Sequence, residues 1–543
     1  MDAEVLLQRS ADVQSLPGRA DQPAGSGAVD CTAYRLGWHG HRALTRFRLP
    51  FDQEEPRARR YNIFPLSTSS AAVRASLTSW SSNSQLVRVI IILALPVTAS
   101  NVLQTLVGFV DTRMVSHLNQ EALAAISVGR TSMWMMMSIF MGLSVGMTAY
   151  IARFAGAQQH ERAKAYATIG LAAGVVIGLG LMLAGLLVGD LPVKWMVTSE
   201  TVSGGAAAQE LTQRYAWDYM SILLIGLAGV GLQFAAVSVF NSLGRTLFPM
   251  WLLVLTNVAN FLGNLLLIPR YQVAGCAWST TITTAVVAGA AVVLLARQDT
   301  LSLIGETLVR PLRKAWEMIK LGLPVTVQVS LRALSMLAII KLITYLPDVE
   351  SAAGQGSLHV GLQAESLAFM PAFAFSTAVA TLVGQNLGAR QISHARQSVL
   401  YCVLGAQIIM WSMGLAFWFY SDWFIALFIG NNAPGISLHA AAFLKIMAAC
   451  LPGLGVGMVM MGVLRGSGDT QITALITVAA MWFFRMPLVI LMAFDNIGGT
   501  DLGFGLGLNG IWWAMTISVY FEAGLAYWRF RAGHWSRVQL SDA

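Results

Sequence analysis

Residues 86–116 read LVRVIIILALPVTASNVLQTLVGFVDTRMVS. This stretch is mostly apolar, and it is longer than the roughly 20 residues that a helix needs to cross about 30 Å of hydrocarbon. Two similar stretches, residues 123–152 and 165–189, follow it along the chain. None of the three shows the strict alternation of an outer-membrane barrel strand. Because a helix satisfies its own backbone hydrogen bonds in lipid, these stretches predict transmembrane helices.

The composition agrees with a membrane protein. Of 543 residues, 56% are hydrophobic and 11% are charged, and the mean hydropathy is +0.61. A soluble domain carries about 25% charged residues, so this chain must expose apolar surface to a lipid bilayer. The net charge of +8 does not indicate a nucleic-acid partner, because the Lys and Arg residues lie in short loops and at helix ends.

The chain is predicted to be an all-α polytopic membrane protein with twelve spans. They fall at residues 87–115, 122–152, 163–189, 215–242, 247–268, 273–296, 317–344, 357–386, 397–419, 440–463, 471–494 and 506–529. Loops on the N-terminal side of these spans hold most of the basic residues, whereas the opposite side holds only Lys194, Arg214, Arg270 and Lys341. The positive-inside rule therefore predicts a bacterial cytoplasmic (inner) membrane protein with both termini cytoplasmic. Residues 1–80, rich in Arg, Pro, Ser and Gly, are predicted to form a disordered cytoplasmic tail.

The sequence also repeats itself at three places. LPVT at residues 95–98 recurs at 323–326, GAQQ at 156–159 matches GARQ at 388–391, and SLGRT at 242–246 matches GSGDT at 466–470. We therefore expect two pseudo-symmetric bundles of six helices, residues 81–300 and 321–535, joined by a cytoplasmic linker at 301–320. An even number of helices in each repeat relates the bundles by an axis along the membrane normal.

This organisation favours transport over catalysis. Two halves around a cleft can open to either side by rocking. The sequence contains no P-loop and no DDxxD motif of a polyprenyl transferase, and no catalytic or metal-binding residues are predicted. We expect a monomer that moves a small-molecule substrate and needs no cofactor beyond a coupling ion, H⁺ or Na⁺.

Several motifs together resemble the multidrug and toxic compound extrusion (MATE) family, in its NorM/DinF-like form. They are LPV (95–97), QT (104–105), GFVDT (108–112), EALAA (121–125), SLAFMP (366–371), LVGQ (382–385), LRG (464–466) and GDT (468–470). The resemblance covers about residues 86–530. It implies twelve helices in a V-shaped pair of lobes, and export of cationic or amphiphilic organic compounds against Na⁺ or H⁺.

Asp111 is the sharpest candidate for cation coupling. A charge inside the membrane is costly, so it is a functional hypothesis by default. The resemblance implies the same role, because the acid of the GFVDT segment is a coupling residue in the family. Asn260 and Asn264 share a helix face, and Asn264 and Thr280 fall at the depth of Asp111, so these polar groups are predicted to share its site. The alternatives are a solvated acid at a helix end and polar side chains that only join helices.

The second half departs from the family. The resemblance puts Arg332 and Leu454 where some relatives carry a Glu and an Asp, and Ile339 stands at the repeat equivalent of Asp111. Arg332, Glu365 and Arg485 fall within roughly 5 Å of one depth. We hypothesise that Glu365 is neutralised by one or both arginines, either as a static ion pair or in coupling or substrate binding.

Other polar and backbone features complete the predicted site. Gln104, Gln363 and Gln385 are candidates to hydrogen-bond a substrate in the cavity. Pro96 and Pro324 occupy equivalent places in the two repeats, and a helix-interior proline frees a carbonyl and bends the helix. Each is either a hinge or a fixed kink. In the family, bending of the first span accompanies protonation of its Asp.

The predicted function is a secondary active antiporter that exports small organic, cationic or amphiphilic compounds in exchange for H⁺ or Na⁺. The alternatives are a lipid-linked precursor flippase and an exporter of an anionic or zwitterionic metabolite. The unusual arginines of the second half suggest the anionic or zwitterionic substrate.

Overall fold

The computed structural model describes residues 83–115, 118, 120–197, 205–303, 305–429, 434–496 and 503–540. All of them belong to one unit, Pro65–Ala543. The predicted tail, residues 1–80, lies outside the described residues. Within them the chain is helical throughout and has no strand.

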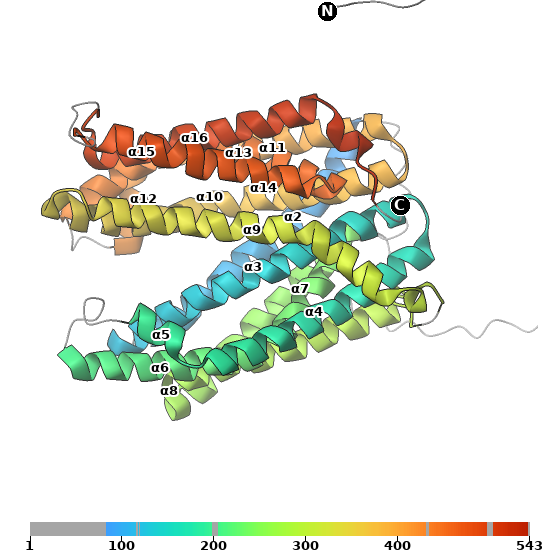
Figure 1. The fold of residues 1–543 in the computed structure, drawn as a ribbon, viewed down its shortest axis with the longest axis horizontal. Coiled ribbons are helices and arrows are strands. Elements are labelled where there is room, and N and C mark those ends of the chain that lie inside the picture. The colour runs from blue at the N-terminus through green and yellow to red at the C-terminus, as the bar shows by residue number, and fades with distance from the viewer. Residues whose placement is uncertain are drawn as a thin grey trace, which may run out of the picture. The chain divides into compact units, whose positions relative to one another are not determined.

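Two groups of helices follow one another along the chain (Figure 1). The first group consists of α2 (Asn83–Val115), α3 (Gln120–Gly156), α4 (His160–Val188), α5 (Leu191–Met196), α6 (Gly205–Ile225), α7 (Leu227–Ser242) and α8 (Leu247–Arg297). The second consists of α9 (Pro311–Ile343), α10 (Asp348–Gly388), α11 (Ile392–Phe419), α12 (Ser421–Ile429), α13 (Pro434–Ser467), α14 (Thr470–Val478), α15 (Met486–Ala493) and α16 (Gly507–Arg531). Short 3₁₀ segments η1 (Gly305–Leu308) and η3 (His534–Arg537) flank the second group, and the π-helical segment η2 (Ala479–Arg485) joins α14 to α15.

The described helices provide the twelve predicted passes. Nine of the described helices are long and apolar enough to cross a membrane, when α14, η2 and α15 are counted as one continuous helix. The pair α6 and α7, bent by 52°, makes one more span. Helix α8 contributes a second pass because Gln272, with φ of 52°, breaks it into two arms. Helix α16 is less apolar, but it has the length of a span and packs along α13. Helix α9 begins at Pro311, so the connection between the groups is shorter than the expected linker.

The repeat in the sequence extends to the backbone. Helices α7 and α13 are both followed by a glycine in the left-handed region, Gly244 and Gly468, with φ of 73° and 91°. Glycine at this position ends a helix without the steric cost of a side chain. The turns after α3 and α10 likewise place Gln158 and Arg390 at φ of 59° and 58°. These are matching positions of the two repeats, so the halves share their turns as well as their helices.

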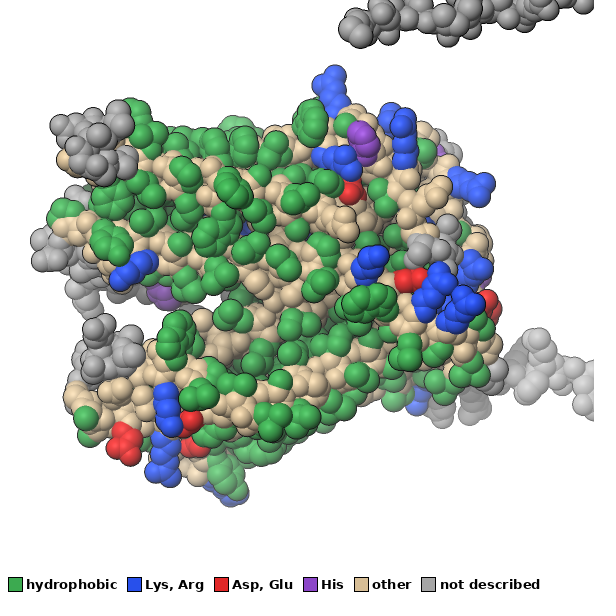
Figure 2. Space-filling model, viewed as in Figure 1, with side chains coloured by type: hydrophobic (Ala, Val, Ile, Leu, Met, Phe, Trp, Pro, Cys, Tyr) green, Lys and Arg blue, Asp and Glu red, His purple; other side chains and the backbone are tan. Residues whose placement is uncertain are grey.

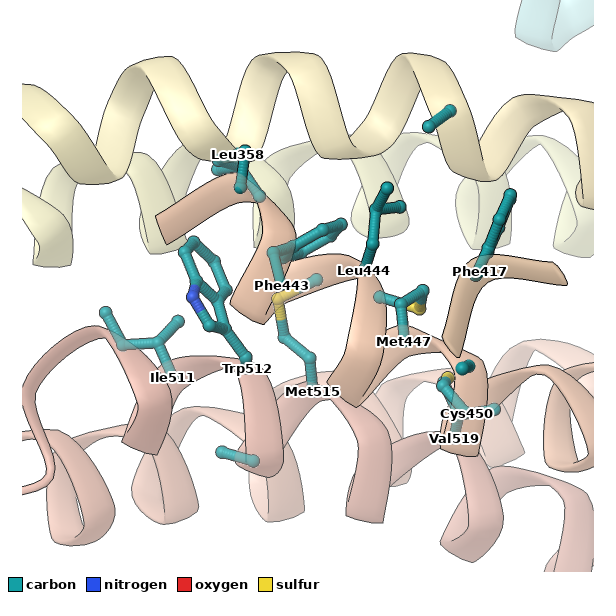
Figure 3. Close-up of a cluster of buried hydrophobic side chains, with 14 of the residues drawn as sticks. Leu358, Phe417, Phe443, Leu444, Met447, Cys450, Ile511, Trp512, Met515 and Val519 are labelled. Atoms are coloured by element: carbon teal, nitrogen blue, oxygen red, sulfur yellow. The ribbon is translucent and has the colours of Figure 1, made fainter. Parts of the chain in front are cut away.

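Apolar side chains fill the interior of each group. In the second group, α10, α13 and α16 enclose a cluster whose centre is an edge-to-face pair, Phe443 and Trp512, with ring centroids 4.9 Å apart (Figure 3). Leu358 of α10 and Met447 of α13 lie in the same cluster. Along α16, the buried polar residues Thr516, Ser518 and Glu522 follow Trp512 toward the C-terminal end of the helix.

The two groups meet most closely where α3 and α10 end. A methyl group at Gly156 would overlap the carbonyl oxygen of Gln385, and one at Gly388 would overlap that of Arg153. The repeat relates both the glycines and the carbonyls, so the crossing is symmetric. Further along α3, the backbone of Gly142 contacts that of Gly322 in α9.

The groups separate toward the other end of the helices. The last hydrogen bonds between them in that direction, among the described residues, join Ser138 to Ser330 at 3.3 Å and the Asn101 amide to the Met370 carbonyl at 3.3 Å. Beyond these two hydrogen bonds, Figure 2 shows a hollow in the surface, at the end that carries α5 and α12. The same view shows many Lys and Arg side chains at the opposite end.

Candidate functional site

Asp111 lies inside the first helix group, where its residue is 5% exposed. The Asn264 side-chain amide donates a hydrogen bond of 2.6 Å to its carboxylate. The same amide also reaches the Asn260 oxygen at 3.2 Å, and the Asn260 amide donates to the Thr280 hydroxyl at 3.0 Å. The four residues predicted from the sequence to share a coupling site therefore form one hydrogen-bonded chain.

The reversal of α8 at Gln272 creates this arrangement. The two arms of the helix run side by side, so that the Ser279 hydroxyl donates to the Asn260 carbonyl oxygen at 2.8 Å. Gly263 faces Ser279 and Gly275 faces the Leu267 backbone, and both contacts need the absence of a side chain. Close packing of the arms brings the amides of one arm beside the hydroxyls of the other.

The site can hold a proton or a small hard cation. A carboxylate and amide or hydroxyl oxygens are the ligands that such cations prefer. The Asn264 oxygen is buried and has no hydrogen-bond partner in the described part of the chain, so it is an acceptor without a donor. Arg130 of α3 lies within electrostatic reach of Asp111. Among the described residues, no three His, Cys, Asp or Glu side chains come together as a metal site.

A cavity that the sequence did not indicate lies at the turn of α8. It has a volume of about 270 Å³ and is lined by α6 and the turn of α8. The Tyr215 hydroxyl donates to the Gln272 side-chain oxygen at 3.0 Å within its wall. Tyr215 and Val273 also belong to the apolar layer around Val115 and Tyr219, near the C-terminal end of α2.

The second helix group holds a different kind of polar cluster. Arg332 of α9 forms an ion pair with Glu522 of α16, at 2.6 Å between nitrogen and oxygen. The Thr477 hydroxyl donates to the same carboxylate oxygen at 2.9 Å, and the Gln328 amide donates to Thr477 at 2.9 Å. The sequence analysis did not predict this cluster: Gln328, Thr477 and the pairing of Glu522 are new in the structure. Two opposite charges inside apolar spans were the available signal.

The expected pairing of Glu365 with the arginines is corrected by this structure. Glu365 lies within electrostatic reach of Arg485 and Arg332, but makes no ion pair with any described residue. Arg332 pairs with Glu522 instead, and Arg485, only 6% exposed, donates to the Ser518 hydroxyl at 2.6 Å. Depth along the helices predicted that the three are close, but the direction of each side chain around its helix decides the contacts.

The glutamines predicted to line the cavity have different environments. Gln104 and Gln363 are exposed, and the Gln363 amide lies 2.9 Å from the His359 ring nitrogen. Gln385 is buried and donates to the Ser242 carbonyl at 2.7 Å, across the closed end of the two groups. It therefore joins the groups and does not line the hollow.

Each predicted hinge proline has a threonine beside it. Pro96 removes the N–H that would bond the Ile92 carbonyl, and the Thr246 hydroxyl donates to that carbonyl at 3.2 Å. Near Pro324, the Thr470 hydroxyl donates to the Leu321 carbonyl at 2.6 Å. Thr246 and Thr470 occupy matching positions of the repeat, so both prolines are accompanied by the same type of contact.

The comparison with protein families shows the same duplication. The MatE family model matches the chain twice, over residues 96–266 and 324–491. The two matches begin at Pro96 and Pro324, the two predicted hinge prolines.

Curated relatives and solved structures match over most of their length. The probable multidrug resistance protein NorM of Thermotoga maritima is 25% identical over 455 residues, which cover 82% of this chain and 92% of the relative. The NorM protein of Pseudomonas aeruginosa is 28% identical over 450 residues, covering 79% and 86%. A MATE crystal structure in complex with MaL6 superposes with a TM-score of 0.74 at 19% identity, covering 86% of this chain and 99% of that one. A MOP superfamily transporter from Pyrococcus furiosus, described by a binding pocket of reverse polarity, superposes with a TM-score of 0.73 at 20% identity, covering 85% and 100%.

Three observations agree on one family: the repeated bundle, the buried acid of the first group and the double match of the family model. Because the family model covers more than half of its residues, the chain belongs to the MatE family, the multidrug and toxic compound extrusion transporters.

Proposed function

We propose that this protein is a proton-coupled antiporter that exports small amphiphilic organic compounds by alternating access. The observation that carries the proposal is the buried Asp111 carboxylate, whose hydrogen bond comes from an uncharged amide. A buried acid without a tightly paired cation can gain and lose a proton as its surroundings change, which is the chemistry that coupling needs.

Asn264 suits both forms of the acid. Its amide stabilises the charged carboxylate, and its buried oxygen is an acceptor that a protonated neighbour can satisfy. Na⁺ is the alternative coupling ion, because the same oxygens are ligands for a hard cation. We favour the proton because the site has one carboxylate and its other polar groups are neutral amides and a hydroxyl.

The arrangement of the helix groups supports alternating access. They touch at the end that carries Gly156 and Gly388 and diverge toward the end that carries α5 and α12 (Figure 2). Most basic side chains lie at the closed end, so the positive-inside rule places that end in the cytoplasm. The hollow then faces outward, and this is the outward-open state of the cycle.

The test uses purified protein in vesicles. Acidic, neutral and cationic forms of one fluorescent compound are offered from outside, with either a pH gradient or a Na⁺ gradient imposed alone. We expect uptake of at least one form with an acidic lumen, accompanied by loss of lumenal protons, and none with the Na⁺ gradient.

Two variants of matched chemistry complete the design. Asp111→Asn should reduce gradient-driven transport to the level of protein-free vesicles, whereas Asp422→Asn, which changes an exposed acid, should leave it unchanged. Uptake driven by Na⁺ alone would replace the proton with Na⁺. Full proton-driven transport by Asp111→Asn would refute the assignment of Asp111.

A further inference from the structure

We infer that the second helix group contains a binding site for the anionic group of an amphiphilic compound, a carboxylate, sulfonate or phosphate, centred on the Arg332 guanidinium. The inference rests on the proposed transport function, since it names the class of compound that this chain would carry.

The first observation is an imbalance of charge in the interior of the group. Three arginines, Arg332, Arg465 and Arg485, lie within electrostatic reach of Glu522, and Arg332 and Arg485 also of Glu365. Among the described residues, three cations against two acids leave one positive charge without an anion. The nearby Asp469 does not supply it, because Asp469 pairs with Arg529 at 2.9 Å. An uncompensated charge inside a membrane is costly, so an anion from outside the chain would be favoured there.

The second observation is that one of the arginines is accessible. The Arg332 side chain is 39% exposed, whereas that of Glu522 is 7% exposed. One nitrogen of Arg332 bonds Glu522, and the rest of the guanidinium has no hydrogen-bond partner among the described residues. A guanidinium is a planar fork that binds a carboxylate or phosphate through two hydrogen bonds. Arg332 is therefore paired on one side and open on the other.

The third observation concerns the two buried arginines behind it. Arg465 has a buried Nε without a hydrogen-bond partner in the described part of the chain. Arg485 closes the π-helical segment η2, which widens the span between α14 and α15. Such segments are rare and are often found at functional sites. A buried donor without an acceptor and a distorted span both occur beside the positive cluster.

Apolar side chains lie beside the positive charge. Met336 is one turn from Arg332 on α9, and Phe369 is one turn from Glu365 on α10. Both are partly buried against the apolar cluster of Figure 3. An anionic amphiphile can place its charge on Arg332 and its apolar part against these side chains, whereas an organic cation would be repelled by the net positive charge.

The test compares two dyes that share a ring system. 1-Anilinonaphthalene-8-sulfonate carries a sulfonate, and N-phenyl-1-naphthylamine is the same skeleton without it. Binding of each is measured by fluorescence to the full-length protein in nanodiscs of zwitterionic lipid, after subtraction of empty nanodiscs. We expect Arg332→Gln to weaken binding of the sulfonate by at least about tenfold, and to change binding of the neutral dye by less than about twofold.

Three variants keep the result interpretable. Arg332→Gln with Glu522→Gln removes both members of the ion pair, so it tests the guanidinium without leaving Glu522 unpaired, and it should show the same loss. Arg332→Lys keeps the charge without the fork and should be intermediate. Arg396→Gln, an exposed arginine on α11, should bind both dyes normally.

Other outcomes overturn the inference. Equal binding of both dyes, or sulfonate binding that survives loss of Arg332 in the double variant, would exclude an anion site. Displacement of the sulfonate by inorganic phosphate alone, with the neutral dye still bound, would show a site for a free ion and not for an amphiphile. Binding needs no gradient, so a protein that binds as expected but fails to transport would reject the proposed function and keep this site.

Discussion

The two helix groups share a backbone but differ in chemistry. Asp111 in the first group has an amide as its hydrogen-bond partner, while its repeat equivalent in the second, Ile339, is fully buried in an apolar cluster. The second group instead carries an ion pair, Arg332 with Glu522, at a different place. The duplication has therefore kept turns and helix crossings, and has let the polar interiors diverge. In our proposals, the first group binds a small cation and the second binds an anionic group.

The threonines beside the hinge prolines differ in a similar way. Thr98 donates to the Ala94 carbonyl of its own helix, whereas its equivalent Thr326 donates to the Ser138 carbonyl of α3, in the other group. Helix α9 is thus tied to its neighbour at the level of Pro324. Helix α2 has no such bond at Thr98, and its hydrogen bond to the other group lies further along, from Asn101 to the Met370 carbonyl.

The strongest way to break the comparison is to move the acid. The double variant Asp111→Asn with Ile339→Asp moves the carboxylate to the equivalent position of the second group. There it loses the amide partner and lies in an apolar cluster. We expect no coupled transport and a loss of roughly 3 kcal/mol or more of folding free energy. Uptake into vesicles measures the coupled transport, and unfolding in denaturant measures the folding free energy. Recovery of transport would show that the two groups are interchangeable.

Removing the acid of each group should have opposite effects on stability. Glu522→Gln leaves Arg332 without its partner and should cost roughly 3 kcal/mol, and adding Arg332→Gln should recover part of that loss. Asp111→Asn removes a buried charge whose hydrogen bond comes from the uncharged Asn264 amide, and should be neutral or stabilising. Thermal unfolding of the four proteins tests this, and equal losses from both acids would contradict the distinction.

The symmetric crossing predicts equal effects in the two groups. Gly156→Ala and Gly388→Ala each place a methyl group on a backbone carbonyl, and each should cost about 1–3 kcal/mol and loosen the closed end. Gly180→Ala, on α4, has open space around the new methyl group and serves as the control. Distances between spin labels on the two groups report the loosening. Unequal losses from the two glycines would contradict the symmetry of the contact.

The threonines should give the smallest effects. Thr246→Val and Thr470→Val each remove one hydrogen bond to a carbonyl and should cost about 1 kcal/mol. Because Thr326 ties α9 to α3 beside Pro324 and Thr98 makes no such tie beside Pro96, we expect only Thr246→Val to change the rate of transport appreciably. Unfolding and initial uptake rates separate the two, and equal rate changes would mean that both prolines act as hinges.

Much of this architecture could be predicted from the sequence. Hydropathy located the spans, and the rise per residue put Asn264 and Thr280 at the depth of Asp111, where the structure has them hydrogen-bonded in one chain. The ion pair of Glu522 could not be predicted, because depth fixes one coordinate and leaves the direction around the helix open. Gln385 was assigned to the cavity for a similar reason, since contacts between the groups are not visible in a single sequence.

If the crossing of Gly142 with Gly322 is the pivot between the two groups, α3 acts as a lever with unequal arms. Along α3 this point lies about 21 Å from Gly156 and about 33 Å from Gln120, at 1.5 Å per residue. If the groups rotate about it by about 15°, the short arm moves by about 5 Å and the long arm by about 9 Å. The opening at the end that carries Gly156 would then be the narrower of the two. In the proposed orientation this end faces the cytoplasm, so the largest compound that this protein can carry would be set where its cargo is loaded and not where it is released.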